Sequence, residues 1–255
     1  MLLDIDGVLV VSWRPVPGAP EALHALRHAG IPVRFLTNTT SRSRAGIATA
    51  LRGAGFPVAD EEVLTAGIAT AEYLAAAHPG ARVLVLNEGP ADDLGDLEVV
   101  GPGDSPDVVV IGAAGPSFTW SAMNDAARAL LGGAALVAMH GTTHWLTDEG
   151  ISVDGGAYVT LLERATGRTA VTIGKPAAAM FTTALTAVGA RAEDAVMVGD
   201  DLRADVLAAQ RVGIHGVLVR TGKFRAGDLP LAGERPDAVL DSVADLPACL
   251  GLPRG

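Results

Sequence analysis

The sequence predicts an α/β fold built on a largely parallel sheet. Short apolar runs alternate with helical patterns along the chain, which is typical of strand–helix–strand connections. Several runs, such as residues 107–112 (DVVVIG) and 195–199 (AVMVG), are rich in valine and do not alternate with polar residues, as expected of strands covered on both faces. With 255 residues, 49% of them hydrophobic, the chain can form one large domain, or a core with a smaller second domain.

Eight apolar runs are predicted to be strands. They cover residues 2–3, 31–37, 82–87, 107–112, 135–139, 170–174, 195–199 and 216–219. Helices are predicted between them, most clearly over 20–30 and 176–189, because each of these segments begins with proline and ends with glycine.

Composition excludes several classes of function. The formal net charge is -10 and no basic stripe is present, which disfavours binding to nucleic acid or to an anionic membrane. The single cysteine, Cys249, allows no internal disulfide. No apolar run is long enough for a membrane span and no signal-like segment opens the chain, so a cytoplasmic protein is expected. An acidic protein of this kind would need a lysine or a metal ion to handle a phosphorylated substrate.

Four predicted strands are followed by polar side chains. The sequences are LLDIDGVLV, FLTNTT, TIGKPAA and VMVGDDLRADV, and they supply Asp4, Asp6, Thr37, Asn38, Lys175, Asp200, Asp201 and Asp205. Ligands of parallel sheets bind at the carboxyl ends of the strands, so these residues are expected to converge.

Phosphoryl transfer would use this set of side chains. Converging carboxylates favour Mg²⁺, which binds a few carboxylates together with phosphate and water. One aspartate can attack phosphorus, and a second, two residues on, can protonate the leaving oxygen and then activate water. Hydroxyl, amide and ammonium groups can stabilise the phosphoryl charge. Taken alone, Asp4 and Asp6 could equally serve a turn, and Lys175 could be a surface lysine at a helix start.

The motifs DIDGVLV, LTNTT, IGKP and GDDLRADV, in this order, resemble the four motifs of the haloacid dehalogenase (HAD) superfamily. The resemblance implies a Rossmann-like core in which Asp4 is the nucleophile and Asp6 the general acid and base. It implies that Thr37, Asn38 and Lys175 bind the phosphoryl group. It also implies that Asp200 binds Mg²⁺ beside Asp4 and the backbone carbonyl of Asp6, with Asp201 and Asp205 as supporting residues.

The spacing of the motifs resembles one branch of the superfamily. About thirty residues separate the first two motifs and more than a hundred separate the second from the third, as in the p-nitrophenylphosphatase group with a large α/β (C2-type) cap. The resemblance implies a core of residues 1–66 and 169–255 and a cap of residues 67–168. The stretch from 136 to 176 is similar to phospholysine phosphohistidine inorganic pyrophosphate phosphatases.

Other residues carry two interpretations. Asp201 and Asp205 could instead be solvated or bonded to backbone, and His140 could be a core or hinge histidine, which is favoured over a substrate contact. Phe118 and Trp120 are expected to pack within the cap, with substrate contact as the alternative.

The resulting prediction is a Mg²⁺-dependent phosphoric monoester hydrolase that acts on a small phosphorylated metabolite, with phosphoamidates or pyrophosphate as further candidates. A phosphotransferase to an acceptor alcohol and a non-catalytic phosphate sensor are the alternatives. The resemblance also suggests a homodimer.

Overall fold

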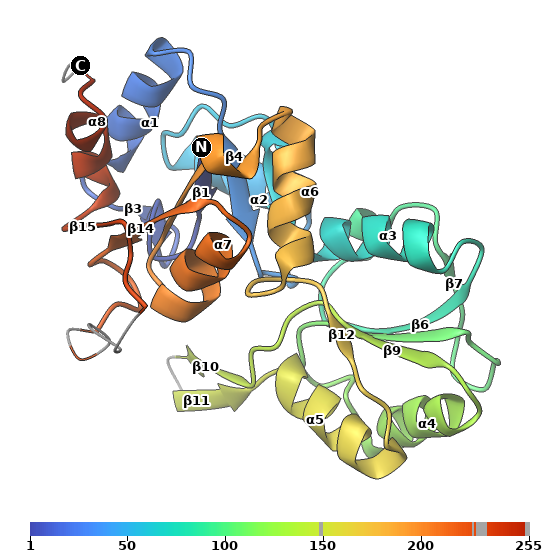
Figure 1. Cartoon of the computed structure of the whole chain (residues 1–255). Helices are drawn as coiled ribbons and strands as arrows, with labels where there is room; N and C mark the ends of the chain where they lie inside the picture. The colour runs from blue at the N-terminus through green and yellow to red at the C-terminus, as the bar shows by residue number, and fades with distance from the viewer. Residues whose placement is uncertain (148–149, 226, 228–233, 253–255) are drawn as a thin grey trace. The chain divides into compact units, whose positions relative to one another are not determined.

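The chain folds into two compact units, coloured along the sequence in the computed structural model of Figure 1. The structure describes residues 1–147, 150–225, 227 and 234–252. The first unit contains Met1–Thr37, Arg44–Leu64 and Lys175–Gly255, and the second contains Asn38–Ser43 and Thr65–Gly174. The assignment of residues 67–168 as a cap stays a prediction.

A six-stranded sheet forms the centre of the first unit, in the order β15-β14-β13-β1-β4-β5. The strands are β1 (Leu2–Asp4), β4 (Arg34–Thr37), β5 (Val63–Thr65), β13 (Val196–Gly199), β14 (His215–Val219) and β15 (Ala238–Leu240). β1 pairs in parallel with β13 on one side and with β4 on the other. All three residues of β1 are buried, which explains why this strand reads as apolar up to Asp4.

Helices cover both faces of this sheet (Figure 1). One face packs against α1 (Ala19–His28), α2 (Arg44–Gly53) and α8 (Leu246–Cys249), through a buried cluster that includes Leu3, Phe35 and Val198. The other face carries α6 (Ala178–Val188), α7 (Ala208–Arg211) and a π-helical turn, η4 (Leu202–Leu207). Since side chains alternate along a strand, Asp4 lies on the opposite face from Leu3.

Short elements complete the first unit. They are the hairpin of β2 (Val10–Val11) and β3 (Arg14–Pro15) and the 3₁₀ turns η1 (Asp60–Glu62), η3 (Ala192–Asp194) and η6 (Val243–Asp245).

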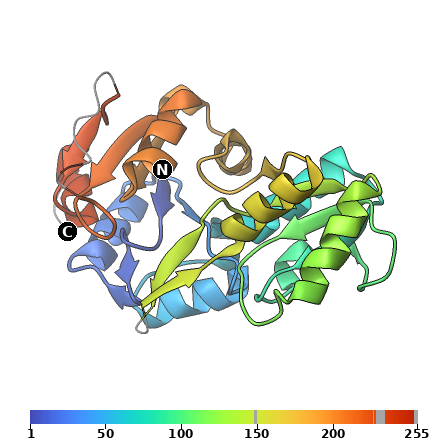
Figure 2. The ribbon, with the colours of Figure 1, turned by 90° about the horizontal axis from the view of Figure 1, so that it is seen from below.

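The second unit has its own parallel sheet, in the order β12-β9-β8-β6-β7. Its strands are β6 (Arg82–Leu86), β7 (Glu98–Val99), β8 (Val108–Ile111), β9 (Ala135–Ala138) and β12 (Val171–Thr172). α4 (Trp120–Leu131) and α5 (Gly155–Thr166) lie side by side on one face, and α3 (Ala66–Ala77) lies on the other (Figures 1 and 2). The 3₁₀ turn η2 (Asp92–Leu94) and an antiparallel hairpin of β10 (His144–Thr147) and β11 (Gly150–Val153) complete the unit.

The predicted α/β class is confirmed, and each of the eight predicted strands is present in the structure. The helices predicted over 20–30 and 176–189 correspond to α1 and α6. No helix in the described ranges is long and apolar enough to cross a membrane.

Candidate active site

Lys175 lies between two buried carboxylates at the carboxyl end of β1. Its Nζ is 2.5 Å from Oδ1 of Asp4 and 2.7 Å from Oδ1 of Asp205. It also approaches the carbonyl oxygen of Leu36, the residue that pairs with Asp4 in the neighbouring strand β4. The three charged side chains are almost fully buried. A buried ammonium between two carboxylates is stable only as an ion pair, so Lys175 is not a surface lysine.

Asp200 follows β13 and packs against two neighbouring glycines. A Cβ atom built on either Gly7 or Gly222 would lie 2.0 Å from Oδ2 of Asp200, so both positions need glycine for the carboxylate to sit there. Oδ2 accepts a hydrogen bond of 2.6 Å from the backbone N–H of Lys223. Oδ1 is buried and has no hydrogen-bond partner among the residues that the structure describes.

Burial dominates the electrostatics of these carboxylates. It raises the pKa of Asp200 to about 7, with the charge of Asp4 adding to the effect. It also raises the pKa of Asp205 to about 6, although the ammonium of Lys175 partly offsets the shift. For Lys175 burial acts the other way, but the charges of Asp205 and Asp4 outweigh it and hold its pKa above the usual value. Lys175 is therefore a permanent cation beside Asp4.

The carboxylate cluster fits a divalent cation. Asp4, Asp200 and Asp205 each offer an oxygen, and these oxygens lie within 4.8 Å of one another. The unpartnered Oδ1 of Asp200 is the strongest indication, because a buried carboxylate oxygen without a donor needs a positive partner. Carboxylate oxygens at hard, oxygen-rich sites are the ligands that Mg²⁺ prefers.

Asp205 differs from the other two carboxylates. Its Oδ1 binds Lys175, and its Oδ2 accepts a hydrogen bond of 3.2 Å from the backbone N–H of Asp201. Asp205 therefore holds Lys175 in place, in addition to lying within reach of the candidate metal position. The alternative of a solvated Asp205 is wrong, because the side chain is 2% exposed.

Asp201 caps the π-helical turn that follows it. Its Oδ1 accepts hydrogen bonds from the backbone N–H groups of Arg203 and Ala204. This agrees with the interpretation in which Asp201 is bonded to backbone.

The other predicted site residues of the core motifs lie at strand ends. Asp6 is half-buried in a closed loop in which the N–H groups of Leu9 and Val10 donate to the carbonyl of Ile5. Asp6 is close enough to Asp4 for its charge to help raise the pKa of Asp4, after the larger effect of burial. Thr37 ends β4 and is buried.

Asn38 directly follows Thr37 in the chain and is grouped with the second unit. Its role in binding the phosphoryl group stays a prediction.

The three predicted second-unit residues have different environments. His140 is buried and accepts a hydrogen bond at Nδ1 from the N–H of Thr142, as expected of a core histidine. Phe118 packs against Tyr158, with ring centroids 4.8 Å apart, which matches the expected packing. For Trp120 the expectation of packing is wrong: it is 82% exposed, because it is the first residue of α4, one turn before the first buried residue, Met123.

Sequence reasoning missed Lys223. Its backbone holds Asp200, and its ammonium is near enough to Asp4 and Asp200 that their charges raise its pKa against the opposing effect of burial. The sequence does carry a signal for Lys223, because this residue comes shortly after the predicted strand 216–219, just as the other site residues come after predicted strands.

Two family models match the chain. One, described as haloacid dehalogenase-like hydrolase, matches residues 1–98, and another, described as HAD-hydrolase-like, matches residues 172–246. The human haloacid dehalogenase-like hydrolase domain-containing protein 2 is 39% identical over 228 residues, which cover 89% of this chain and 86% of that protein. The chain belongs to the haloacid dehalogenase-like hydrolase family.

Other relatives of this hydrolase are phosphatases by name. The rat phospholysine phosphohistidine inorganic pyrophosphate phosphatase is 34% identical over 252 residues, which cover 96% of this chain and 91% of that protein. The solved structure of a p-nitrophenyl phosphatase from Archaeoglobus fulgidus superposes with a TM-score of 0.90 at 31% identity and covers 97% of both chains. These matches confirm the predicted family and enzyme class, a phosphoric monoester hydrolase.

Proposed function

We propose that this hydrolase is a Mg²⁺-dependent phosphatase that cleaves a small phosphorylated metabolite through an aspartyl-phosphate on Asp4. The observation that carries the proposal is the buried ion pair of Asp4 with Lys175, next to an Asp200 oxygen that has no donor in the described part of the chain. A nucleophilic carboxylate must be ionised; burial raises the pKa of Asp4, and the adjacent Lys175 opposes that rise by favouring the charged form.

In the first half of the proposed reaction, a carboxylate oxygen of Asp4 attacks phosphorus. The bond between phosphorus and the ester oxygen breaks, and Asp6 gives its proton to the leaving oxygen. Lys175, held by Asp205, stabilises the charge that develops on the phosphoryl oxygens. By the family resemblance, Thr37 and Asn38 donate hydrogen bonds to the same oxygens.

In the second half, Asp6 takes a proton from water as the water oxygen attacks phosphorus. The bond between phosphorus and Asp4 breaks, which releases phosphate and restores the Asp4 carboxylate. Asp4, Asp200 and the backbone carbonyl of Asp6 would hold Mg²⁺, which supplies positive charge against the phosphoryl group when bound. A cytoplasmic location and a homodimer stay predictions.

The test is phosphate release from p-nitrophenyl phosphate and a panel of phosphorylated metabolites, with Mg²⁺ and with EDTA. We expect turnover that needs Mg²⁺ and falls to background in Asp4→Asn. The matched control is Asp241→Asn, an 80% exposed aspartate of the same unit that pairs with Arg220, and it should keep full turnover. A folded wild type that releases no phosphate from any compound would contradict the proposal.

The alternative reaction, transfer to an alcohol, differs only in the acceptor of the second half. Adding glycerol or ethanol to the assay separates the two, because a phosphotransferase would form the phosphorylated alcohol in preference to free phosphate.

A further inference from the structure

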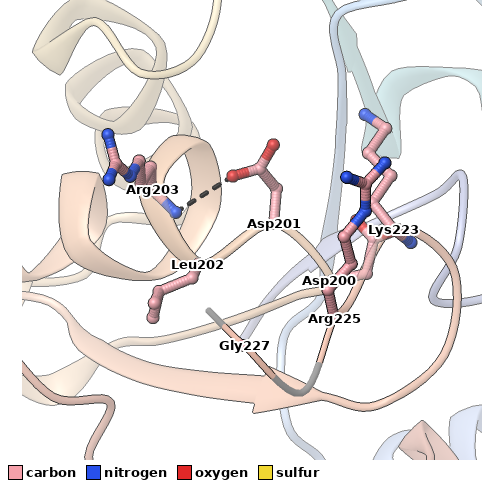
Figure 3. Close-up of a pocket in the computed structure, with 7 residues that line it drawn as sticks. All are labelled: Asp200, Asp201, Leu202, Arg203, Lys223, Arg225 and Gly227. Atoms are coloured by element: carbon pink, nitrogen blue, oxygen red, sulfur yellow. Dashed lines mark hydrogen bonds between the residues drawn. The ribbon is translucent and has the colours of Figure 1, made fainter. Parts of the chain in front are cut away.

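A positively charged pocket lies beside the candidate metal ligand Asp200. It has a volume of about 430 Å³, and its lining includes Arg203, Lys223 and Arg225 together with Asp200 and Asp201 (Figure 3). Three cationic and two acidic residues therefore line this pocket. Asp201 is already engaged by backbone N–H groups, so its negative charge is partly satisfied within its own turn.

Two adjacent strands place these cations. Arg203 lies in the first turn of η4, after β13, whereas Lys223 and Arg225 lie in the loop after β14. The two strands are paired in parallel up to Gly199 and Leu218, so both loops leave the sheet at the same edge. The strand order that assembles the carboxylates therefore also assembles this pocket.

The gathering of cations stands out against the charge of the chain. The protein carries a formal net charge of -10, so its overall field repels an anionic substrate. Local cations at the site would offset that repulsion. Lys223 connects the carboxylate cluster with the pocket, because its backbone N–H donates to Asp200 and Lys223 also lines the pocket.

The pocket adds Arg203, Lys223 and Arg225 to the cation already supplied by Lys175. In the proposed mechanism that group is already served by Lys175 and by a bound metal ion. Among the described residues, neither Lys223 nor Arg203 has an acidic ion-pair partner within 4.0 Å. Arginine and lysine at a pocket wall are suited to bind carboxylate or phosphate oxygens.

We infer that Arg203, Lys223 and Arg225 bind a second anionic group on the leaving part of the substrate. The substrate class is a phosphoryl ester whose leaving group carries a carboxylate or another phosphate. This inference rests on the proposed phosphatase function and narrows it. It identifies Lys223, Arg203 and Arg225 as specificity-determining residues.

The test compares matched substrates that differ only in the second anion. One pair is phospholactate and isopropyl phosphate, and the other is propanediol bisphosphate and propyl phosphate. For the wild type we expect kcat/KM to be at least about 10-fold higher, in one of the pairs, for the member with the second anion than for the member without it, because a hydrogen bond to a charged group contributes about that factor. The pair that shows the preference identifies carboxylate or phosphate as the second group.

Variants assign the preference to the pocket. Lys223→Gln and Arg203→Gln should each lower the ratio of kcat/KM between the two members about 10-fold. If a variant only disturbed the structure, it would lower kcat/KM equally for both members of a pair and leave their ratio unchanged. The matched control is Arg220→Gln, an arginine just before the same loop that pairs with Asp241 outside the pocket and should keep the wild-type ratio.

A binding measurement separates the inference from the proposed function. Calorimetry on Asp4→Asn with phospholactate and isopropyl phosphate needs no turnover. Turnover of p-nitrophenyl phosphate with ratios near one in both pairs would overturn the inference and leave the phosphatase function intact. If the protein shows no turnover but binds phospholactate more tightly than isopropyl phosphate, the proposed function is wrong and the inference about the pocket is supported. If it shows neither turnover nor this binding preference, the proposed function and the inference are both wrong.

Discussion

Gly7→Ala should damage the active site through one atom. Gly7 has a φ of 90°, and a Cβ built there lies 2.0 Å from Oδ2 of Asp200. Real Cβ atoms essentially never show contacts under 3.0 Å, so the carboxylate must move by about 1 Å, the difference between these two distances. The movement is constrained, because the backbone of Gly222 lies only 3.0 Å from the same added Cβ and the N–H of Lys223 holds the same oxygen.

Two costs follow, and they can be separated. A positive φ costs a non-glycine residue roughly 1–2 kcal/mol of folding free energy. Misplacing a catalytic group by about 1 Å costs on the order of 100-fold in rate, or about 2.7 kcal/mol of transition-state stabilisation. Gly55→Ala is the matched control, because Gly55 has a φ of 91° and its Cβ would meet nothing within 4 Å.

Both variants should therefore lose the stability that a positive φ costs, measured as the free energy of unfolding in urea, and Gly7→Ala should lose more because its Cβ also displaces Asp200. Only Gly7→Ala should lose about 100-fold in kcat/KM on p-nitrophenyl phosphate, and its Mg²⁺ affinity, measured by calorimetry, should fall with it. If Gly7→Ala kept activity and Mg²⁺ affinity within about two-fold of Gly55→Ala, the assignment of Asp200 as a tightly held metal ligand would be wrong.

Three further predictions concern charge. Lys175→Met removes the cation between the buried carboxylates of Asp4 and Asp205, so at pH 8 it should lower the free energy of unfolding, measured by urea titration, by about 3–5 kcal/mol. The loss should be smaller at pH 5, where the carboxylates can take protons. An equal loss at both pH values would refute this account. Burial raises the pKa of Asp200 to about 7 and that of Asp205 to about 6. Their protonated forms therefore stabilise the metal-free fold at low pH, and this stabilisation is lost as pH rises through 6–7. Mg²⁺ should raise Tm more at pH 8 than at pH 5.5, and an equal rise in Tm at both pH values would count against the metal site. Although partial burial opposes it, the contacts with Arg27 and with the N–H of Ala59 hold the pKa of Glu62 below its usual value. The ionised Glu62 therefore stabilises the fold above its unfolded pKa, and this stabilisation is lost as pH falls through its folded pKa. Glu62→Gln should lower the free energy of unfolding by about 1 kcal/mol at pH 7 and by almost nothing at pH 3, and a constant loss across this range would disprove the ionic contribution.

The sequence was sufficient for the fold class and for part of the candidate site. Strands that are buried on both faces have a simple apolar signature, and polar residues directly after them must lie at one edge of a parallel sheet. That rule led to Asp4, Lys175 and Asp200, which the structure brings together although they are far apart in the chain.

The rule could not give the role of Asp205, because that role depends on the backbone geometry of η4. At the start of a regular helix, Asp205 would simply be a second acidic side chain, four residues after Asp201. In the π-helical turn it is buried against Lys175 and accepts the N–H of Asp201. Nor could sequence spacing assign Asn38 to the second unit, or show that Trp120 begins its helix beyond the packed core.

The position of β1 also sets when the active site can come into existence. β1 precedes its neighbour β13 by a long stretch of chain, and its pairing of Leu2 with Met197 joins positions 195 residues apart. The ribosome must therefore deliver most of the chain before the central strand has both neighbours, and contacts of such long sequence separation form slowly. Nascent or interrupted chains that lack Lys175 and Asp205 carry Asp4, the proposed nucleophile, without the cation that pairs with it. In a refolding experiment, phosphatase activity should consequently be among the last properties to return, later than helix content.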